Sequence, residues 1–152
     1  MKRVKNQLLN LAIGEFAALC TFIFVYKSLR LGMGSLVGFS YLIFILFQGS
    51  MYWLYRYRLL IRTECFGQKA IKIFRFLKYL NLVVSVIIGI ILPIISSSNK
   101  DLIISAGVFL FGIIEFINYY WYRLSYGKSG FNIKILLNTK LKKSSLNKMI
   151  NK

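Results

Sequence analysis

The sequence predicts an all-α membrane protein, an antiparallel bundle of four transmembrane helices with two basic amphipathic segments. Three observations carry this prediction. Of the 152 residues 57% are hydrophobic and one is proline, which is too apolar for a soluble core of this size. Four apolar runs are long enough to cross ~30 Å of hydrocarbon, which takes roughly 20 helical residues. Most of the 21 basic residues lie between these runs.

The predicted spans are residues 8–26, 36–55, 80–98 and 102–122. In hydrocarbon the backbone polar groups of each span must be paired within it, and these runs lack the alternation of barrel strands, so all four are expected to be helices. The links "KSLRLGMGS" and "NKD" are short and favour antiparallel neighbours. Residues 1–126 are therefore predicted to form the transmembrane domain, and residues 127–152 a basic cytoplasmic tail.

The basic residues indicate the orientation, because Lys and Arg accumulate in cytoplasmic segments. Three lie near the amino terminus, seven between the second and third spans, and eight from Arg123 onward. The other side has only Lys27, Arg30 and Lys100. We therefore expect a multi-pass protein of a bacterial cytoplasmic membrane with both termini in the cytoplasm. Since topology explains the net charge of +17 and no nucleic-acid motif is present, we expect no nucleic-acid partner.

Two segments outside the spans alternate apolar and basic residues at helical spacing, as in helices that lie on a membrane surface. They are residues 68–79, "QKAIKIFRFLKY", and the tail from Phe131. The candidate ligands of lipid headgroups are Lys72, Arg75, Lys78, Lys134, Lys140, Lys142 and Lys143. Two interpretations stay open: binding of anionic lipid or an acidic partner, and unselective anchoring at the cytoplasmic face.

The composition excludes several kinds of site. The chain has no histidine and no cluster of cysteines or carboxylates, so we expect no metal, no cofactor and no enzymatic activity. The glycine-rich "GMGSLVG" lies at the end of a predicted span, where Gly34 and Gly38 favour close helix packing over phosphate binding. Gly14 with Ala18, and Gly112, are expected to serve the same purpose.

Strong polar residues recur at one depth in the apolar runs. Glu15, Gln48 and Glu115 each lie seven residues, or about 10 Å along a helix, from the cytoplasmic end of their spans. The residues that share a helix face with Glu115 are Asn118, Tyr119 and Tyr122. A carboxyl group in lipid costs on the order of 3 kcal/mol, so these side chains are predicted to meet in a buried polar layer.

The acids of this layer allow two functions. Glu15 and Glu115 could form a proton-linked or cation-binding site, or they could fix the register of the helices through hydrogen bonds. The stretch "LAIGEFAALC", residues 11–20, resembles the first helix of the small multidrug-resistance exporters over about ten residues. That resemblance implies a glutamate that exchanges protons for cationic drugs. The second acid, Glu115, and the two basic amphipathic segments are not features of those exporters.

The sequence therefore favours a small accessory or interaction protein of the membrane, a class that includes immunity proteins. Its expected partners are anionic lipids and either another membrane protein or further copies of itself. The alternative is a small proton-coupled transporter or exporter that uses Glu15 and Glu115.

Overall fold

The computed structural model describes residues 2–29, 31–64, 66–124 and 142–151, and in these ranges the chain is helical. Its helices are α1 (Lys2–Leu29), α2 (Met33–Arg62), α3 (Gln68–Ile95), α4 (Asn99–Tyr120) and the short α6 (Ser145–Ile150). The β-bridge that the described residues form joins Tyr122 to Lys143. Four of the helices are long and apolar enough to cross a membrane, which confirms a helix at each of the four predicted spans.

The helices extend beyond most of the predicted boundaries. Residues 68–79, predicted to lie as a separate helix on the membrane surface, are instead the first part of α3. Tyr79 and Leu80 carry on the helix without a glycine or proline that could end it, so the amphipathic segment and the apolar span form one rod of 28 residues, about 42 Å long. Tyr122, predicted to end the fourth span, lies beyond the end of α4.

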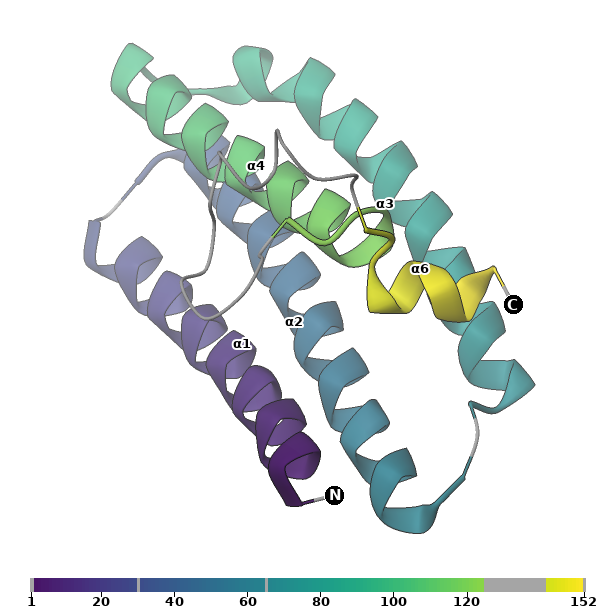
Figure 1. Ribbon diagram of the computed structural model, residues 1–152. Helices are drawn as coiled ribbons and strands as arrows, with labels where there is room; N and C mark the ends of the chain where they lie inside the picture. Colours follow the sequence, from purple (N-terminus) through teal and green to yellow (C-terminus); the bar gives the residue numbers. More distant parts are fainter. Residues whose placement is uncertain (1, 30, 65, 125–141, 152) are drawn as a thin grey trace.

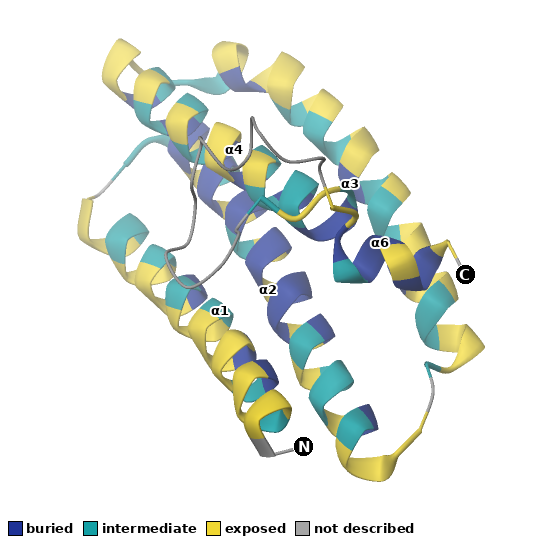
Figure 2. Ribbon diagram, viewed as in Figure 1, coloured by how far each residue is buried: buried dark blue, intermediate teal, exposed yellow. Residues whose placement is uncertain are grey.

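Helix α2 lies at the centre of the structure (Figure 1). It packs against α1, α3 and α4, whereas α1 and α4 contact each other little. Accordingly, α2 is the most buried of the four long helices, and α1 and α3 are exposed along most of their length (Figure 2).

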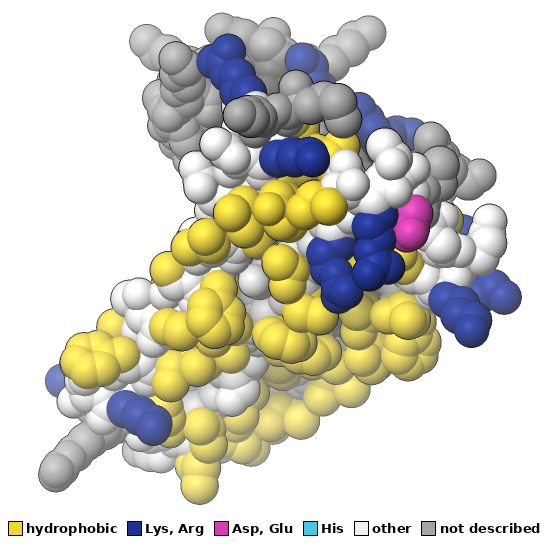
Figure 3. All heavy atoms as spheres, turned by 90° about the horizontal axis from the view of Figure 1, so that it is seen from below, with side chains coloured by type: hydrophobic (Ala, Val, Ile, Leu, Met, Phe, Trp, Pro, Cys, Tyr) yellow, Lys and Arg dark blue, Asp and Glu magenta, His cyan; other side chains and the backbone are white. Residues whose placement is uncertain are grey.

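The helix ends fall into two groups. The start of α1 and the link between α2 and α3 lie at one end, which we call the basic end, and α6 lies beside α3 between this end and the middle of the structure (Figure 1). The links between α1 and α2 and between α3 and α4 lie at the other, which we call the far end. Seen from the basic end, Lys and Arg side chains lie around and between hydrophobic ones (Figure 3).

Small residues let α2 and α4 approach each other closely. A Cβ atom added at Gly38 would lie 2.9 Å from the carbonyl oxygen of Ser105, and one at Gly112 would lie 2.8 Å from the ring of Tyr41. Both contacts are shorter than side chains allow, so the helices could not keep this spacing with alanine at either position. The prediction for Gly112 and Gly38 is thus confirmed. The prediction for Gly14 is wrong, because Gly14 is exposed and a Cβ there would touch nothing.

Asp101, in the first turn of α4, joins that helix to the start of α2. Its carboxylate accepts hydrogen bonds from the backbone N–H groups of Gly34 (3.1 Å), Ser35 (3.0 Å) and Ser97 (3.1 Å), and from the Ser35 hydroxyl. The N–H of Asp101 in turn donates to the hydroxyl of Ser98, the N-cap of α4. The first N–H groups of a helix have no partner within it, and their positive dipole favours an anion. One buried carboxylate therefore caps α2 from another helix and closes the far end.

The described part of the C-terminal segment packs against α3 and α4. Leu146, Met149 and Ile150 are buried in the same apolar cluster as Phe74 and Phe116. The backbone of this segment is also bonded to the residue after α4, because the N–H of Ser144 donates to the carbonyl of Trp121 at 2.9 Å. Ser144 then caps α6 by accepting from the N–H of Asn147.

Many large apolar side chains remain exposed on the long helices. Phe24 of α1, Ile94 of α3 and Ile103 of α4 are 71%, 77% and 73% exposed. Such extensive apolar exposure fits surfaces that face lipid rather than water.

Removing the Asp101 carboxylate should loosen the far end. We expect Asp101→Ala to lower the stability in detergent by about 2–4 kcal/mol, because it leaves buried N–H donors of α2 without an acceptor. Thermal unfolding of the purified protein measures the effect. Glu64→Ala, which removes an exposed carboxylate just after α2, is the matched control and should change the midpoint little. Equal midpoints for the two variants would show that the Asp101 cap does not hold α2 and α4 together.

Candidate functional site

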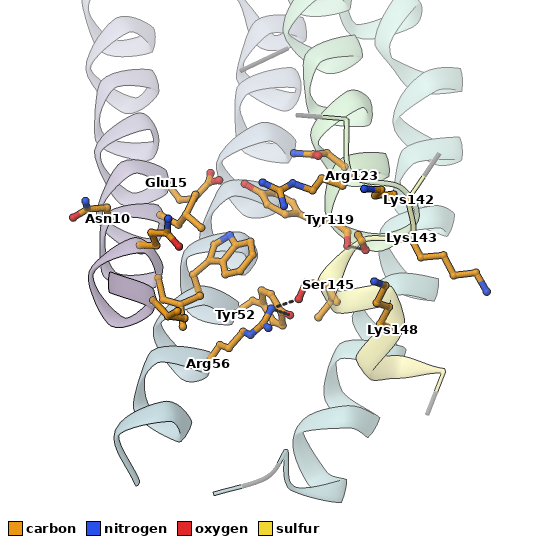
Figure 4. A pocket seen from close by; sticks show the side chains of 18 residues that line it. Asn10, Glu15, Tyr52, Arg56, Tyr119, Arg123, Lys142, Lys143, Ser145 and Lys148 are labelled. Carbon is orange, nitrogen blue, oxygen red and sulfur yellow. Dashed lines mark hydrogen bonds between the residues drawn. The ribbon is translucent and has the colours of Figure 1, made fainter. Parts of the chain in front are cut away.

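A groove of about 760 Å³ opens between α1 and the side formed by α4 and the C-terminal segment (Figure 4). It exists because α1 packs on α2 and does not close against α4 at the basic end. Helix α2 forms its floor with Tyr52, Trp53 and Arg56. The α1 wall includes Val4, Leu8, Leu11 and Glu15, and the opposite wall includes Asn118, Tyr119, Arg123, Lys142, Lys143, Ser145 and Lys148.

Apolar side chains close the groove toward the far end. The rings of Phe22 on α1 and Phe111 on α4 lie 5.9 Å apart, and Phe22 also contacts Phe39 of α2 at 6.3 Å. Leu19 and Leu42 pack beside them in one apolar cluster. The groove is therefore open at the basic end and closed by apolar side chains toward the far end.

Four of the predicted polar residues lie together at the inner end of this groove or beside it. The Asn118 side chain donates to the carboxylate of Glu115 at 3.2 Å and accepts from the N–H of Leu124 at 2.9 Å. Figure 4 shows Glu15 and the Tyr119 hydroxyl pointing toward each other across the groove. The carboxylates of Glu15 and Glu115 are close enough to interact electrostatically with each other and with Tyr119. Within the described part of the chain, the buried Tyr119 hydroxyl makes no hydrogen bond of normal geometry.

Gln48 lies in a different polar group. Its side-chain oxygen accepts from Asn81 of α3 at 2.7 Å and from the Tyr120 hydroxyl of α4 at 2.6 Å, and its nitrogen donates to Asn81 at 3.3 Å. Gln48, Asn81 and Tyr120 are all buried. They form a closed network that joins α2, α3 and α4, so the structure divides the predicted polar layer into this network and the acids around the groove.

Tyr122 and the predicted headgroup ligands are placed in several environments. Tyr122 is 38% exposed and does not line the groove. Arg75 donates to the carbonyl of Ile150 at 2.7 Å, and the ammonium of Lys78 lies 4.8 Å from the centre of the Trp121 ring. These two cations thus contact the C-terminal segment and the residues after α4.

The other predicted headgroup ligands differ from this pair. Lys72 is exposed on α3, and Lys142 and Lys143 are exposed at the groove. Lys134 and Lys140 lie outside the described residues.

Several residues of the site were not predicted from the sequence. Asn81 lies one residue inside the third predicted span, and its amide is a signal comparable to Gln48. Asp101 sits in the short "NKD" link, where a preceding serine at Ser98 indicates a helix N-terminus. Arg56 gave no such signal, because its place in the groove depends on how the C-terminal segment returns to α2: its guanidinium donates to the Ser145 hydroxyl.

Comparison with known proteins does not assign the chain to a family. No family model matches the chain, and no curated protein or solved structure matches it. Within the described ranges, no group of three His, Cys, Asp or Glu side chains could hold a metal ion. Any function therefore has to be argued from the groove and its residues.

The Gln48 network gives a prediction in which two changes are better tolerated than one. Gln48→Leu alone should destabilise the protein in detergent by roughly 1–2 kcal/mol, because Asn81 and Tyr120 lose a buried partner. Adding Asn81→Leu should restore part of this loss, since fewer polar groups are then left unpaired. Thermal unfolding of both single variants and the double variant forms the cycle. Strictly additive effects would show that Gln48 and Asn81 do not interact.

Proposed function

We propose that this protein is a small accessory or interaction protein of a bacterial cytoplasmic membrane, of the kind that includes immunity proteins, and that it binds a partner within the membrane. One observation supports this most: the groove between α1 and α4 places the half-buried Glu15 carboxylate in an open, one-ended site that the buried Tyr119 also lines. Ionisable groups at membrane depth are rare and usually serve a site.

The proposed orientation places the antiparallel bundle with the basic end in the cytoplasm. The excess of Lys and Arg near this end supports it, because cytoplasmic segments carry such an excess. In this orientation both termini and the mouth of the groove face the cytoplasm.

A transmembrane segment of another protein is the partner that the groove suits best. The α1 wall is apolar at Leu8 and Leu11 and ends at Glu15, so an apolar helix with one hydrogen-bond donor or cationic side chain would be complementary to it. Such a donor would meet both the Glu15 carboxylate and the Tyr119 hydroxyl. Another copy of this chain is a second possible source of the segment.

Proton-coupled transport is the alternative function. The proximity of Glu15 and Glu115 favours it, because two interacting carboxylates can exchange a proton for a cation. The packing of Phe22 against Phe111 and Phe39 speaks for the interaction protein instead, because a transporter needs a path that can open on the other side.

A photoreactive amino acid in the groove should capture the partner in cells. We expect benzoylphenylalanine at Leu11, in the groove, to give a discrete protein crosslink, because Leu11 would contact the bound segment. The same probe at Phe24, which is 71% exposed near the far end, is the control and should give none. Gel shifts of the full-length tagged protein report both. Absence of a protein crosslink at Leu11, or equal crosslinks at both positions, would contradict partner binding in the groove.

Glutamine substitutions separate the two functions. In vesicles with a pH gradient, we expect the purified protein not to dissipate the gradient when tetraphenylphosphonium is added. The Glu15→Gln and Glu115→Gln variants should give the same result as the unchanged protein. In cells, Glu15→Gln should weaken the Leu11 crosslink, because it removes the charge at the end of the groove. Cation-dependent proton flux that either substitution abolishes would favour the transporter.

Cysteine labelling tests the proposed orientation. In a Cys20→Ser background the remaining cysteine is Cys65, in the link between α2 and α3. A membrane-impermeant maleimide should label Cys65, and an antibody should reach a tag after Lys152, only after the cells are opened. Labelling of either site in intact cells would show that the proposed orientation is wrong.

A further inference from the structure

The basic end of the groove carries a concentrated positive charge. Five of its lining residues are basic and one is acidic. The basic residues come from three separate parts of the chain: Arg56 from α2, Arg123 from the residues after α4, and Lys142, Lys143 and Lys148 from the C-terminal segment. Their convergence is therefore produced by the fold and is not a run of neighbouring lysines.

The geometry turns most of this charge toward the groove. Arg56, Ser145 and Lys148 lie at its outer end, and Arg123 extends toward Tyr119 (Figure 4). Lys143 points away. The guanidinium of Arg56 is held through Nη1, which donates to the Ser145 hydroxyl and to Tyr52 at 3.4 Å. A guanidinium has five N–H donors in a planar fork, so Arg56 is oriented and keeps donors for an anion.

The wall facing these cations carries apolar side chains beside the polar Gln7 and Asn10. Val4, Leu8 and Leu11 of α1 line the groove opposite Arg56, and Trp53 lies on the floor between the two sides. A soluble anion would use only the basic side of this site. An amphiphile would use both, with its charged group on the cations and its chain along α1, whose outer surface is apolar and open.

We infer that the basic end of the groove binds the phosphate group of an anionic phospholipid, with an acyl chain along the α1 wall. Arg56 and Lys148 hold the phosphate, and Arg123 and Lys142 add to the attraction. Basic pockets between transmembrane helices recognise anionic headgroups in this way. The inference does not rest on the proposed partner, because it concerns the purified protein alone. The acyl chain and a partner segment would share Leu8 and Leu11 of the α1 wall, so the two would compete for it.

Fluorescence of Trp53 reports occupancy of this site. The chain has two tryptophans, Trp53 and Trp121, so Trp121→Phe leaves the one in the groove as the emitter. The full-length protein is placed in nanodiscs that contain brominated phosphatidylglycerol or brominated phosphatidylcholine at equal mole fractions. We expect markedly stronger quenching by the brominated phosphatidylglycerol.

Charge substitutions identify the residues. Arg56→Gln with Lys148→Gln should weaken the apparent preference for phosphatidylglycerol roughly tenfold, and Lys148→Gln alone, at an exposed position, should weaken it by a smaller factor. Arg62→Gln with Lys69→Gln removes the same charge from exposed positions beside the link between α2 and α3, outside the groove, and should leave the preference unchanged. Circular dichroism checks that each variant stays helical.

Three results would overturn the inference. The first is equal quenching by the two brominated lipids. The second is an equal loss of preference in the control variant Arg62→Gln with Lys69→Gln, which would indicate general surface charge. The third is displacement of the brominated lipid by millimolar inorganic phosphate, which would assign the cluster to a soluble phosphate instead of a headgroup.

Discussion

Helices α2 and α4 pack so closely that only glycine fits at two positions: Gly38 lies against the Ser105 carbonyl, and Gly112 lies against Tyr41. The Asp101 carboxylate of α4 caps the start of α2 and so fixes how the two helices are aligned along their axes. In hydrocarbon the hydrophobic effect does not drive helices together, so close packing and interhelical hydrogen bonds must do so. Gln48 then ties α3 to the pair through Asn81 and Tyr120. These hydrogen bonds join the three helices into one unit.

Helix α1 is attached to this unit through α2. Leu19 packs on Leu42 and Leu46, and the Ser50 hydroxyl donates to the Ala12 carbonyl at 3.2 Å. Since α1 does not pack against α4 at the basic end, the space between the two helices is left as the groove. Glu15 lies on α1, which packs mainly on α2, and its half-buried carboxylate lines the groove, where a group from outside the chain could reach it.

The long apolar runs could be predicted from the sequence because length and hydropathy determine a membrane span without reference to its neighbours. The grouping of Glu15 with Glu115 was inferred from a common depth in the predicted spans, and Tyr119 was added because it shares a helix face with Glu115. Depth alone does not give direction around a helix axis, so it grouped Gln48 with the acids although Gln48 faces α3. Asp101 and Arg56 act through residues distant in the chain, Ser35 and Ser145, and such pairs depend on the tertiary fold.

The central claim is that the groove opens only at the basic end and stops at the Phe22 contact. Single cysteines at positions 11, 15 and 22, in a chain with Cys20 and Cys65 replaced by serine, test it directly. A charged methanethiosulfonate applied from each side of sealed vesicles should modify positions 11 and 15 from the side of the basic end, and should not modify position 22 from either side. Modification of position 22, or of position 15 from the far end, would show a path through the protein and would contradict the account.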